Sequence, residues 1–359
     1  MRERWIRLRN RVLSDRDVTR FAVRFPLTRP IARARARGIF DLVAGFVYSQ
    51  ATAAAIETGL IAFLAKGSAT VGAFAAKSGL PDDAAATLMR AAAALRLAEE
   101  VAPGRFALGV LGESLHGSPG IAELVRHHRL LYADLADPVA LLMRGGGGGQ
   151  LSALWTYAEG KGEARAAAEA YSALMAASQP LLAAHILDAV DLSGARHLLD
   201  IGGGEGAFLE AVAARHPRLR LSLLDLPEVA ERARARLGDR VTVHAGSFAD
   251  APLPEGADTV TLVRVVHDHD DAVVADLFAA IARLLPRGGR LILAEPMAGT
   301  RGAEASGHAY FGFYLLAMGS GRPRTAEELS AMLRAAGFGR VAERPTHLPL
   351  AVRVLVATR

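Results

Sequence analysis

The second half of the chain alternates short apolar runs with amphipathic stretches of ten or more residues. The apolar runs that predict strands are RHLLDIG (196–202), RLSLLDL (220–226), VTVHAG (241–246), TVTLVRVV (259–266) and RLILAEP (290–296). Strands that alternate with helices form a doubly wound, Rossmann-like parallel sheet, in which ligands lie at the carboxyl ends of the strands. The last stretch, THLPLAVRVLVATR (346–359), predicts a strand pair that closes one edge of this sheet.

A different pattern precedes this sheet. Thr70 opens a short helix, a second helix is predicted over 83–97, and EEVAPGRFALG (99–109) predicts a two-stranded wing. This order is typical of a winged helix, a fold that often binds DNA. The second helix, however, offers only Arg90 and Arg96 to a DNA groove and is otherwise mainly alanine and leucine. The pattern therefore favours dimerisation through apolar faces over nucleic-acid binding.

Apolar helices flank the winged helix on both sides. Residues 41–65 predict one long helix that is buried in the fold, because its apolar part, 42–56, is shorter than the ~20 residues that a bilayer requires. Residues 119–190 predict further helices around the glycine run MRGGGGGQ (143–150). No strand precedes this run, so it predicts a flexible loop and not a phosphate-binding turn.

Composition and charge narrow the classes of protein. The 359 residues include no cysteine, which excludes disulfides, zinc ribbons and thiol nucleophiles. The formal charge is +5, yet residues 1–40 hold twelve arginines against three acidic residues, so the remainder is slightly acidic. No signal-peptide pattern is visible, which favours a cytoplasmic protein.

Apolar side chains interleave with the arginines of the N-terminal arm, residues 1–40: Trp5, Ile6, Leu8, Phe21 and Phe25. The arm is expected either to lie on an anionic membrane or to pack on a partner subunit.

The stretch HLLDIGGGEGAFL (197–209) breaks a predicted strand with glycines before a helix begins. Glycine permits positive φ and lets a ligand lie against bare backbone beside the N–H groups of the helix. A dinucleotide would use Gly202, Gly204 and Ala207, whereas S-adenosylmethionine would use Gly202, Gly204 and Gly206. Asp200 favours S-adenosylmethionine, because a carboxylate repels a pyrophosphate and attracts a sulfonium and an amino group.

A second carboxylate, Asp225, follows about 20 residues later at the end of the next predicted strand, where it can accept ribose hydroxyls of either cofactor. It therefore supports a nucleoside and does not choose between the two cofactors.

Five motifs follow one another in the C-terminal half. They are LLDIGGGEGAF (198–208), GSFADAPLP (246–254), LVRVVHDHDDAVV (262–274), LLPRGGRLILAEPM (284–297) and RTAEELSAMLRAAGF (324–338). In this order they resemble the S-adenosylmethionine-dependent O-methyltransferases with an N-terminal winged-helix dimerisation domain, the group of plant caffeate and animal acetylserotonin enzymes. Residues 25–50 and 127–142 resemble more narrowly the enzymes of purple-bacterial carotenoid synthesis that act on hydroxyneurosporene and demethylspheroidene.

The resemblance implies a cofactor site. Asp200 and the three glycines match the family's cofactor turn, and Asp225 with Leu226 matches the ribose contact. Where the family carries an aspartate near the adenine amine, this chain has Ser247, followed by Phe248. Arg264 lies at the end of the fourth predicted strand and is expected either to position cofactor or acceptor or to be a surface charge.

The resemblance also implies a general base, His267. Methyl transfer to oxygen requires loss of a proton, and imidazole titrates in the useful range. Family members hold this histidine with two glutamates; Glu295 matches the first, but Pro323 stands at the second, so Asp268 is a candidate substitute. A metal site is not predicted, because consecutive residues cannot converge on one ion; Asp268 to Asp271 are instead expected as helix caps and first-turn acids.

The family's acceptor pocket is lined by a helix that matches HAYFGFYLLAMG (308–319). Core packing is the alternative reading of such an apolar stripe. The matching pocket residues are His308, Phe311, Tyr314, Met318 and, from the middle region, Met175. A pocket of this composition suits a long apolar molecule.

These observations predict an O-methyltransferase that acts on the tertiary hydroxyl of a hydroxylated carotenoid. The alternatives are a phenolic, indolic or bacteriochlorophyll-type acceptor, or a non-catalytic, cofactor-sensing DNA-binding regulator. The expected organisation is an arginine-rich arm (1–40), a winged-helix dimerisation domain (41–118), a helical connector that lines the acceptor pocket (119–190) and a cofactor-binding domain (191–359). The protein is expected to be a homodimer in the cytoplasm, with its arm either on the inner membrane or packed on the partner subunit.

Overall fold

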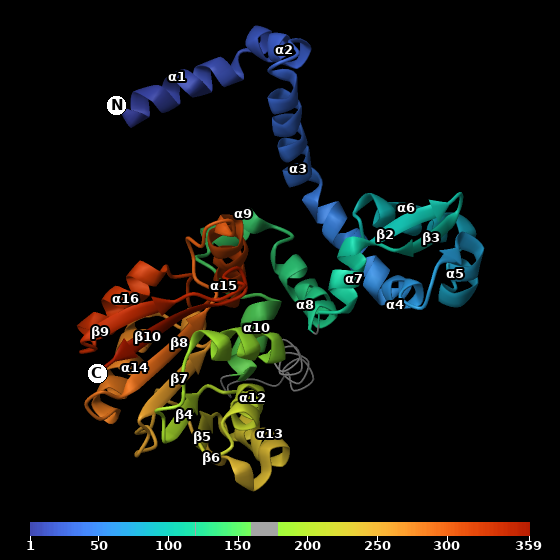
Figure 1. The fold of residues 1–359 in the computed structure, drawn as a ribbon. Coiled ribbons are helices and arrows are strands. Elements are labelled where there is room, and N and C mark those ends of the chain that lie inside the picture. The colour runs from blue at the N-terminus through green and yellow to red at the C-terminus, as the bar shows by residue number, and fades with distance from the viewer. Residues whose placement is uncertain (119, 159–178) are drawn as a thin grey trace. The chain divides into compact units, whose positions relative to one another are not determined.

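The computed structural model of the protein describes residues 1–118, 120–158 and 179–359. By its internal contacts the chain divides into two compact units, Met1–Ser118 and Pro119–Arg359. Each unit has its own secondary structure and is described separately (Figure 1).

The first unit begins with four helices: α1 (Arg2–Ser14), α2 (Arg16–Arg24), α3 (Arg29–Glu57) and α4 (Leu60–Leu64). The single helix expected over 41–65 is wrong at both ends. Arginine and alanine are strong helix formers, so α3 starts at Arg29 with Pro30 in its first turn. It ends before Gly59, whose φ of +77° is a left-handed conformation that stops the helix.

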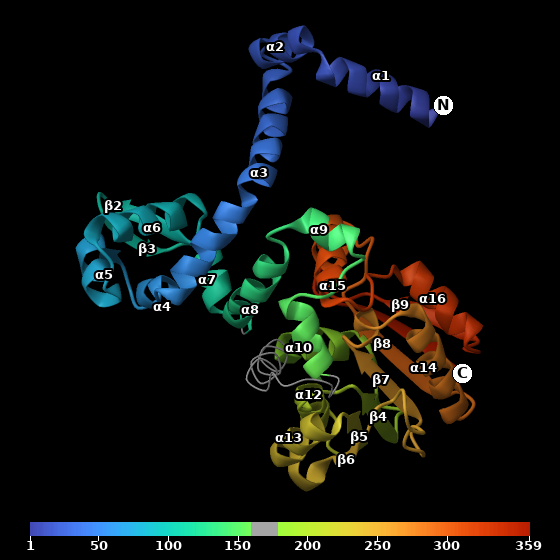
Figure 2. The ribbon, with the colours of Figure 1, turned by 180° about the vertical axis from the view of Figure 1, so that it is seen from behind.

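The expected burial of this helix is also wrong. Leu42 is 86% exposed and Phe46 is 66% exposed, because no other element of the unit covers this face of α3. By length and composition alone, α3 could cross a membrane. It is the only helix of the described residues that could. A continuous α3 leads from α2 to the rest of the unit (Figure 2).

The winged helix is present as predicted. Thr70 caps α5 (Val71–Ser78) by accepting a hydrogen bond from the N–H of Ala73, and α6 (Asp82–Ala94) follows after the turn. The remaining elements are β1 (Ala69–Thr70), β2 (Ala98–Ala102), β3 (Arg105–Leu108) and α7 (Val110–His116). The strands form a three-stranded antiparallel sheet in the order β1-β3-β2, so β2 and β3 make the wing.

The second unit is built on a seven-stranded sheet. Its strands are β4 (His197–Ile201), β5 (Arg220–Asp225), β6 (Thr242–Ala245), β7 (Thr259–Val263), β8 (Arg290–Glu295), β9 (Arg340–Arg344) and β10 (Arg353–Thr358). The order is β6-β5-β4-β7-β8-β10-β9, with the first five parallel and β10 antiparallel to both of its neighbours. The predicted doubly wound, Rossmann-like sheet is confirmed.

The predicted closing strand pair is only half right. Residues 346–352 form turns, and the strand that pairs with β10 is β9, before the Pro345 turn. Strand β9 carries charged residues at both ends and is therefore the polar edge of the sheet, whereas β10 lies inside it.

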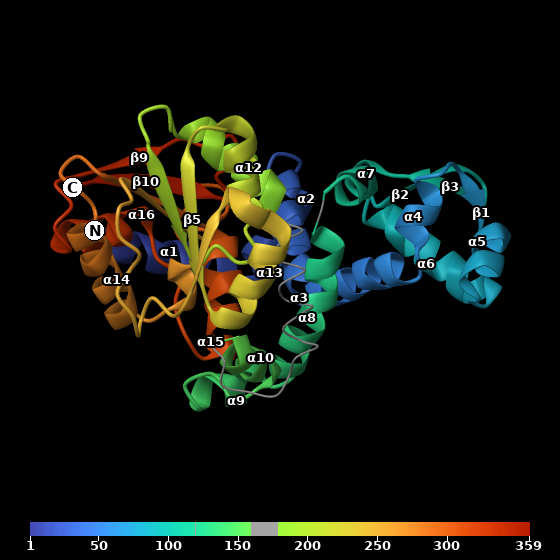
Figure 3. The same ribbon diagram turned by 90° about the horizontal axis from the view of Figure 1, so that it is seen from below.

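Helices cover both faces of this sheet (Figure 3). On one face, α14 (Asp271–Leu284) and α16 (Ala326–Ala335) pack against a core that includes Leu199 and Leu262. On the other, helical residues 179–189, α12 (Ala207–Arg215) and α13 (Pro227–Leu237) pack against a core that includes Leu198. Neighbouring residues of β4 thus enter opposite cores, as the two-residue period of a strand requires.

The middle region contains α8 (Ile121–Asp134), α9 (Pro138–Met143) and α10 (Gln150–Ala158). The glycine run between α9 and α10, expected as a flexible loop, partly packs against other helices. Gly147 donates a backbone hydrogen bond to the carbonyl of Leu316 (2.8 Å), and a Cβ on Gly149 would lie 2.2 Å from a carboxylate oxygen of Asp134. That carboxylate accepts the N–H groups of Gln150 and Leu151 and so caps α10. Glycine is needed here for close approach.

Candidate active site

The glycine turn joins β4 to α12 at the carboxyl end of the central strand. Gly202, Gly204 and Gly206 have φ angles of +68°, +59° and +84°, which only glycine adopts without strain. The turn is also tight, since a Cβ on Gly203 would lie 2.5 Å from Oδ2 of Asp200. The result is a bare backbone surface that leads to the N-terminus of α12, as the sequence predicts.

Asp200 lies beneath this turn and is completely buried. Its Oδ1 accepts a hydrogen bond from the hydroxyl of Thr261 (2.6 Å), while its Oδ2 has no hydrogen-bond partner among the residues that the structure describes. Burial, with a further contribution from Asp225, raises the pKa of Asp200 to about 7. A cationic group would stabilise the ionised form of a buried carboxyl group whose second oxygen accepts no hydrogen bond.

Asp225 ends β5 next to the turn. Its two oxygens accept backbone N–H groups from Gly204 and from Leu226, each at 2.7 Å. Burial raises the pKa of Asp225 although both hydrogen bonds act in the opposite direction. Each oxygen keeps a further lone pair, so the carboxylate can hold the turn and still accept hydroxyl groups.

The next strand, β6, leads to Ser247 and Phe248. The Ser247 hydroxyl accepts the N–H of Ala249 (3.1 Å) and so shapes its own turn. The Phe248 ring lies edge-on to the ring of His269, with centroids 5.1 Å apart. The residues predicted for the turn, the ribose and the adenine therefore follow the carboxyl ends of three neighbouring parallel strands, β4, β5 and β6.

His267 follows β7 in a short 3-10 turn, η2 (Val266–Asp268), and lies between two carboxylates. Its Nδ1 is 2.6 Å from Oε2 of Glu295, and its Nε2 is 3.1 Å from Oδ1 of Asp268. Both predicted partners thus contact the imidazole, one on each nitrogen. The ring is also covered by Phe311, at a centroid distance of 5.8 Å.

Burial and charge act in opposite directions on this group. Burial lowers the pKa of His267, but Asp268 and Glu295 outweigh it, so the pKa is raised above its ordinary value. Burial raises the pKa of Asp268 to about 6, although His267 opposes the change. Each of the two groups therefore shifts the pKa of the other, so His267 and Asp268 titrate as an interacting pair.

Arg264 directly follows β7 with a φ of +58°, an uncommon conformation for a side-chain-bearing residue. Its backbone N–H donates to the carbonyl of Ala294 on β8 (2.9 Å). The positive charge of Arg264 lowers the pKa of both His267 and Asp268, so the side chain is near enough to act on them. Its role towards cofactor or acceptor stays a prediction.

The expected helix caps are partly wrong. Asp270 is the N-cap residue of α14, but its side chain makes no capping hydrogen bond and instead accepts the N–H of Gly321 (3.0 Å). Asp271 is a first-turn acid as expected and pairs with Arg322 and Arg324. Asp268 contacts His267 instead. The three acids therefore bind different residues.

Arg324 is the supporting residue that sequence reasoning missed. It is 2% exposed, and its guanidinium donates to the carbonyls of Val266 (2.8 Å) and His269 (2.8 Å). These carbonyls flank His267, so Arg324 fixes the backbone of the turn that carries it. The available signal was the Arg-Thr pair that opens α16, where Thr325 and Glu328 form a capping box.

A π-helix, η3 (Ala305–Phe311), followed by α15 (Gly312–Met318), carries the predicted pocket residues. Phe311 contacts His267, as described above, whereas His308 is exposed and Met318 is buried in the core. Met175 lies outside the described residues. Residues 308–319 therefore combine both predicted roles: Met318 packs in the core, and Phe311 contacts His267.

Two histidine–tyrosine pairs border Phe311 and were not anticipated. Nε2 of His127 lies 2.8 Å from the Tyr314 hydroxyl, and Nε2 of His128 lies 2.8 Å from the Tyr310 hydroxyl. Burial, with a contribution from His128, lowers the pKa of His127 to about 4, and burial raises the pKa of Tyr310 to about 12. These pairs are therefore neutral near pH 7 and add polarity without charge.

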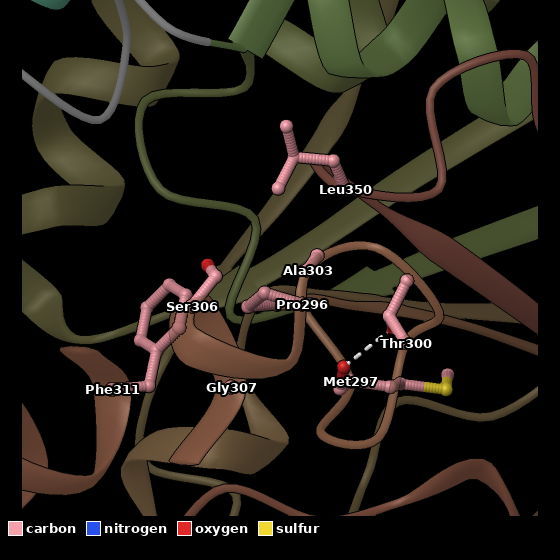
Figure 4. A pocket seen from close by; sticks show the side chains of 8 residues that line it. All are labelled: Pro296, Met297, Thr300, Ala303, Ser306, Gly307, Phe311 and Leu350. Carbon is pink, nitrogen blue, oxygen red and sulfur yellow. Dashed lines mark hydrogen bonds between the residues drawn. The ribbon is translucent and has the colours of Figure 1, made fainter. Parts of the chain in front are cut away.

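Phe311 also lines a small, mainly apolar hollow (Figure 4). The hollow is lined by Pro296, Met297, Thr300, Ala303, Ser306, Gly307, Phe311 and Leu350. The Thr300 hydroxyl is occupied, because it donates to the carbonyl of Met297 (2.7 Å). The surface of the hollow is therefore mainly hydrocarbon.

The glycine turn, the two strand-end aspartates and the buried histidine define a Rossmann-like enzyme with a nucleoside-type cofactor site beside an acid–base group. Residues 132–339 match the family model of the O-methyltransferase domain. The chain is 41% identical over 360 residues to demethylspheroidene O-methyltransferase of Cereibacter sphaeroides, which covers 98% of this chain and 95% of the relative. It is 43% identical over 338 residues to the Rhodobacter capsulatus enzyme of the same name, which covers 94% of this chain and 85% of that relative.

Solved structures agree in fold. The mitomycin 7-O-methyltransferase superposes with a TM-score of 0.76 at 26% identity, over 92% of this chain and 100% of the other. Human N-acetylserotonin methyltransferase, solved in complex with S-adenosylmethionine, gives a TM-score of 0.78 at 23% identity, over 90% and 97% of the two chains. The chain belongs to the O-methyltransferase family.

Proposed function

We propose that the protein is an S-adenosylmethionine-dependent O-methyltransferase that methylates the tertiary hydroxyl of a hydroxylated carotenoid of the demethylspheroidene or hydroxyneurosporene type. The observation that carries this proposal is the 41% identity with a demethylspheroidene O-methyltransferase over nearly the whole of both chains. Phe311 supports it, because its ring contacts His267 and also lines the apolar hollow, and a carotenoid is hydrocarbon except near its hydroxyl end.

The residues at the strand ends fit the cofactor. S-adenosylmethionine, when bound, supplies a methyl group on a positively charged sulfonium sulfur. The open oxygen of Asp200 suits a cationic amino group, and the left-handed glycines leave room for a ligand against the backbone. Asp225 and Leu226 would hold the ribose, Ser247 and Phe248 the adenine, and Arg264 would face the cofactor from β7.

His267 is the proposed general base. Glu295 accepts the Nδ1 proton and so turns Nε2 towards Asp268 and the reaction space. Nε2 would take the proton of the acceptor hydroxyl while that oxygen attacks the methyl group, and the Asp268 carboxylate would stabilise the imidazolium that forms. A tertiary alcohol is a weak acid, so it needs this base more than a phenol does.

The acceptor would lie along η3 and α15. Phe311 would place the hydroxyl end near His267, with Tyr314, Met318, His308 and Met175 as the further pocket residues proposed from the family. The polar hydroxyls of Tyr310 and Tyr314 would then lie at the end of the pocket where the acceptor carries its oxygen.

Assembly and location complete the proposal. Residues 41–118 would form the dimerisation domain, since the apolar face of α3 is exposed in the single chain, and residues 119–190 would line the pocket. The homodimer would work at the inner face of the membrane in which a carotenoid dissolves.

Transfer of a labelled methyl group tests the function. The protein is incubated with methyl-labelled S-adenosylmethionine and either a hydroxylated carotene in detergent micelles or a phenolic acceptor. The proposal expects a labelled methyl ether of the carotene as the preferred product. Labelling of the phenol alone would contradict the carotenoid acceptor and leave the methyltransferase assignment standing.

A further inference from the structure

The two N-terminal helices bury no residue at all. Large apolar side chains stand on their surfaces: Trp5 is 61% exposed, Leu8 59% and Phe21 60%. Water-exposed aromatic residues at this density are unusual for a helix that has no function at its surface. The helices therefore present a surface that something else covers.

Each helix carries an apolar face with arginines beside it. In α1, Trp5, Leu8 and Val12 follow the three- and four-residue spacing of one face. Arg4, Arg7 and Arg11 follow the same spacing along the side next to this face. An apolar face bordered by arginines is typical of a helix that lies in a membrane interface.

A similar pattern recurs in α2. Val18 and Phe21 lie on one face, and Phe25 follows on it at the C-cap, with the rings of Phe21 and Phe25 stacked 5.2 Å apart. Arg20 and Arg24 lie on the other face. Both helices thus carry an apolar face with arginines beside it. A helix that is surrounded by water does not require such a face.

Two surfaces could cover the apolar faces of α1 and α2: a second copy of the chain or a lipid bilayer. Charge favours the bilayer. Residues 1–40 hold twelve arginines and three acidic residues. If the arms of two copies paired with each other across a two-fold axis, like charges would face each other. An anionic bilayer provides both an apolar layer and the opposite charge.

We propose that residues 1–28 bind the surface of an anionic lipid bilayer, with α1 and α2 in the headgroup region and Trp5, Leu8, Phe21 and Phe25 turned into the acyl boundary. This interaction surface is independent of methyl transfer. It would bring the enzyme to the phase in which an apolar acceptor is dissolved.

Vesicle flotation of the full-length protein tests the proposal. Vesicles are made of phosphatidylcholine alone or of phosphatidylcholine with phosphatidylglycerol. Binding is expected only with phosphatidylglycerol and is expected to weaken in high salt, because salt screens the surface potential. Equal binding to both vesicles, or no binding to either, would overturn the proposal.

Two arm variants and one control locate the surface. The triple variant Arg4→Gln, Arg7→Gln, Arg11→Gln should bind about a hundredfold more weakly, and Trp5→Ala with Phe21→Ala roughly tenfold more weakly. The control removes three exposed arginines of the second unit, Arg218→Gln, Arg287→Gln and Arg301→Gln, and should bind as the parent does. An equal loss in the control would contradict an arm-specific surface. So would a triple arm variant that binds vesicles normally and changes only the sedimentation of the lipid-free protein.

Discussion

Glu295 holds both the imidazole and the backbone of the turn that carries it. Its Oε2 lies 2.6 Å from Nδ1 of His267, and its Oε1 accepts the N–H groups of Val265 (2.9 Å) and Val266 (2.7 Å). One buried carboxylate therefore fixes the tautomer and the orientation of the histidine together.

The first prediction concerns this tautomer. In Glu295→Gln, the amide oxygen can still accept the two backbone N–H groups, but the NH₂ group then faces Nδ1. The histidine proton would move to Nε2, and turnover should fall by ~10²–10⁴-fold, the usual range for loss of general-base catalysis. Initial rates and cofactor binding are measured side by side. Unchanged turnover, with the exposed Glu343→Gln as a control, would show that Glu295 does not orient the base.

The second prediction concerns pH. The base must be free of its second proton, and the carboxylates raise the pKa of His267, so activity should be lost on acidification at a pH above the ordinary value for histidine. Asp268→Asn removes the larger of the two charges that raise this pKa. The acid limb of the turnover profile should then move to lower pH. A limb that stays in place would mean that Asp268 does not raise the pKa of the base.

The third prediction concerns the cofactor. Asp225→Ala should weaken S-adenosylmethionine binding by about 1.5–3 kcal/mol, the range for hydrogen bonds that involve a charged group. Isothermal titration calorimetry measures the loss, and Glu228→Ala on the neighbouring α13 provides a comparison. NAD should not bind to the parent protein. Binding of NAD, with no effect of Asp225→Ala, would contradict the cofactor assignment.

The fourth prediction concerns assembly. The exposed face of α3 should be the dimer contact, so Leu42→Asp with Phe46→Asp should convert a dimer into a monomer. Sedimentation velocity at micromolar concentration distinguishes the two states. The exposed Val101→Asp, in the wing, should leave the dimer intact. A parent protein that sediments as a monomer would refute the proposed homodimer.

The sequence was informative where one local signal decides the structure. The run from His197 to Ile201 could only be a buried strand followed by a glycine turn, and Thr70 marked the start of a helix. It was misleading where long-range contacts decide. The glycines at 145–149 looked like a flexible loop, yet Asp134 and Leu316 pack against them from other helices.

Residues of the candidate site divide in the same way. Asp268 and Glu295 were both predicted as partners of His267: Glu295 from the family resemblance, and Asp268 as the candidate substitute for the family's second glutamate. Arg324 and the pair of His128 with Tyr310 were missed, since their hydrogen bonds join segments more than 50 residues apart. No local pattern records such a contact.

The central claim, that His267 is the base for an unactivated alcohol, is tested most directly by His267→Ala. The measurement is the initial rate on a hydroxylated carotene in detergent micelles, beside equilibrium binding of S-adenosylmethionine. The expected result is a loss of turnover of about 10²–10⁴-fold, with cofactor affinity nearly unchanged and a smaller loss on a phenolic acceptor. A near-normal rate on the carotene would contradict the claim and leave positioning alone as the source of catalysis.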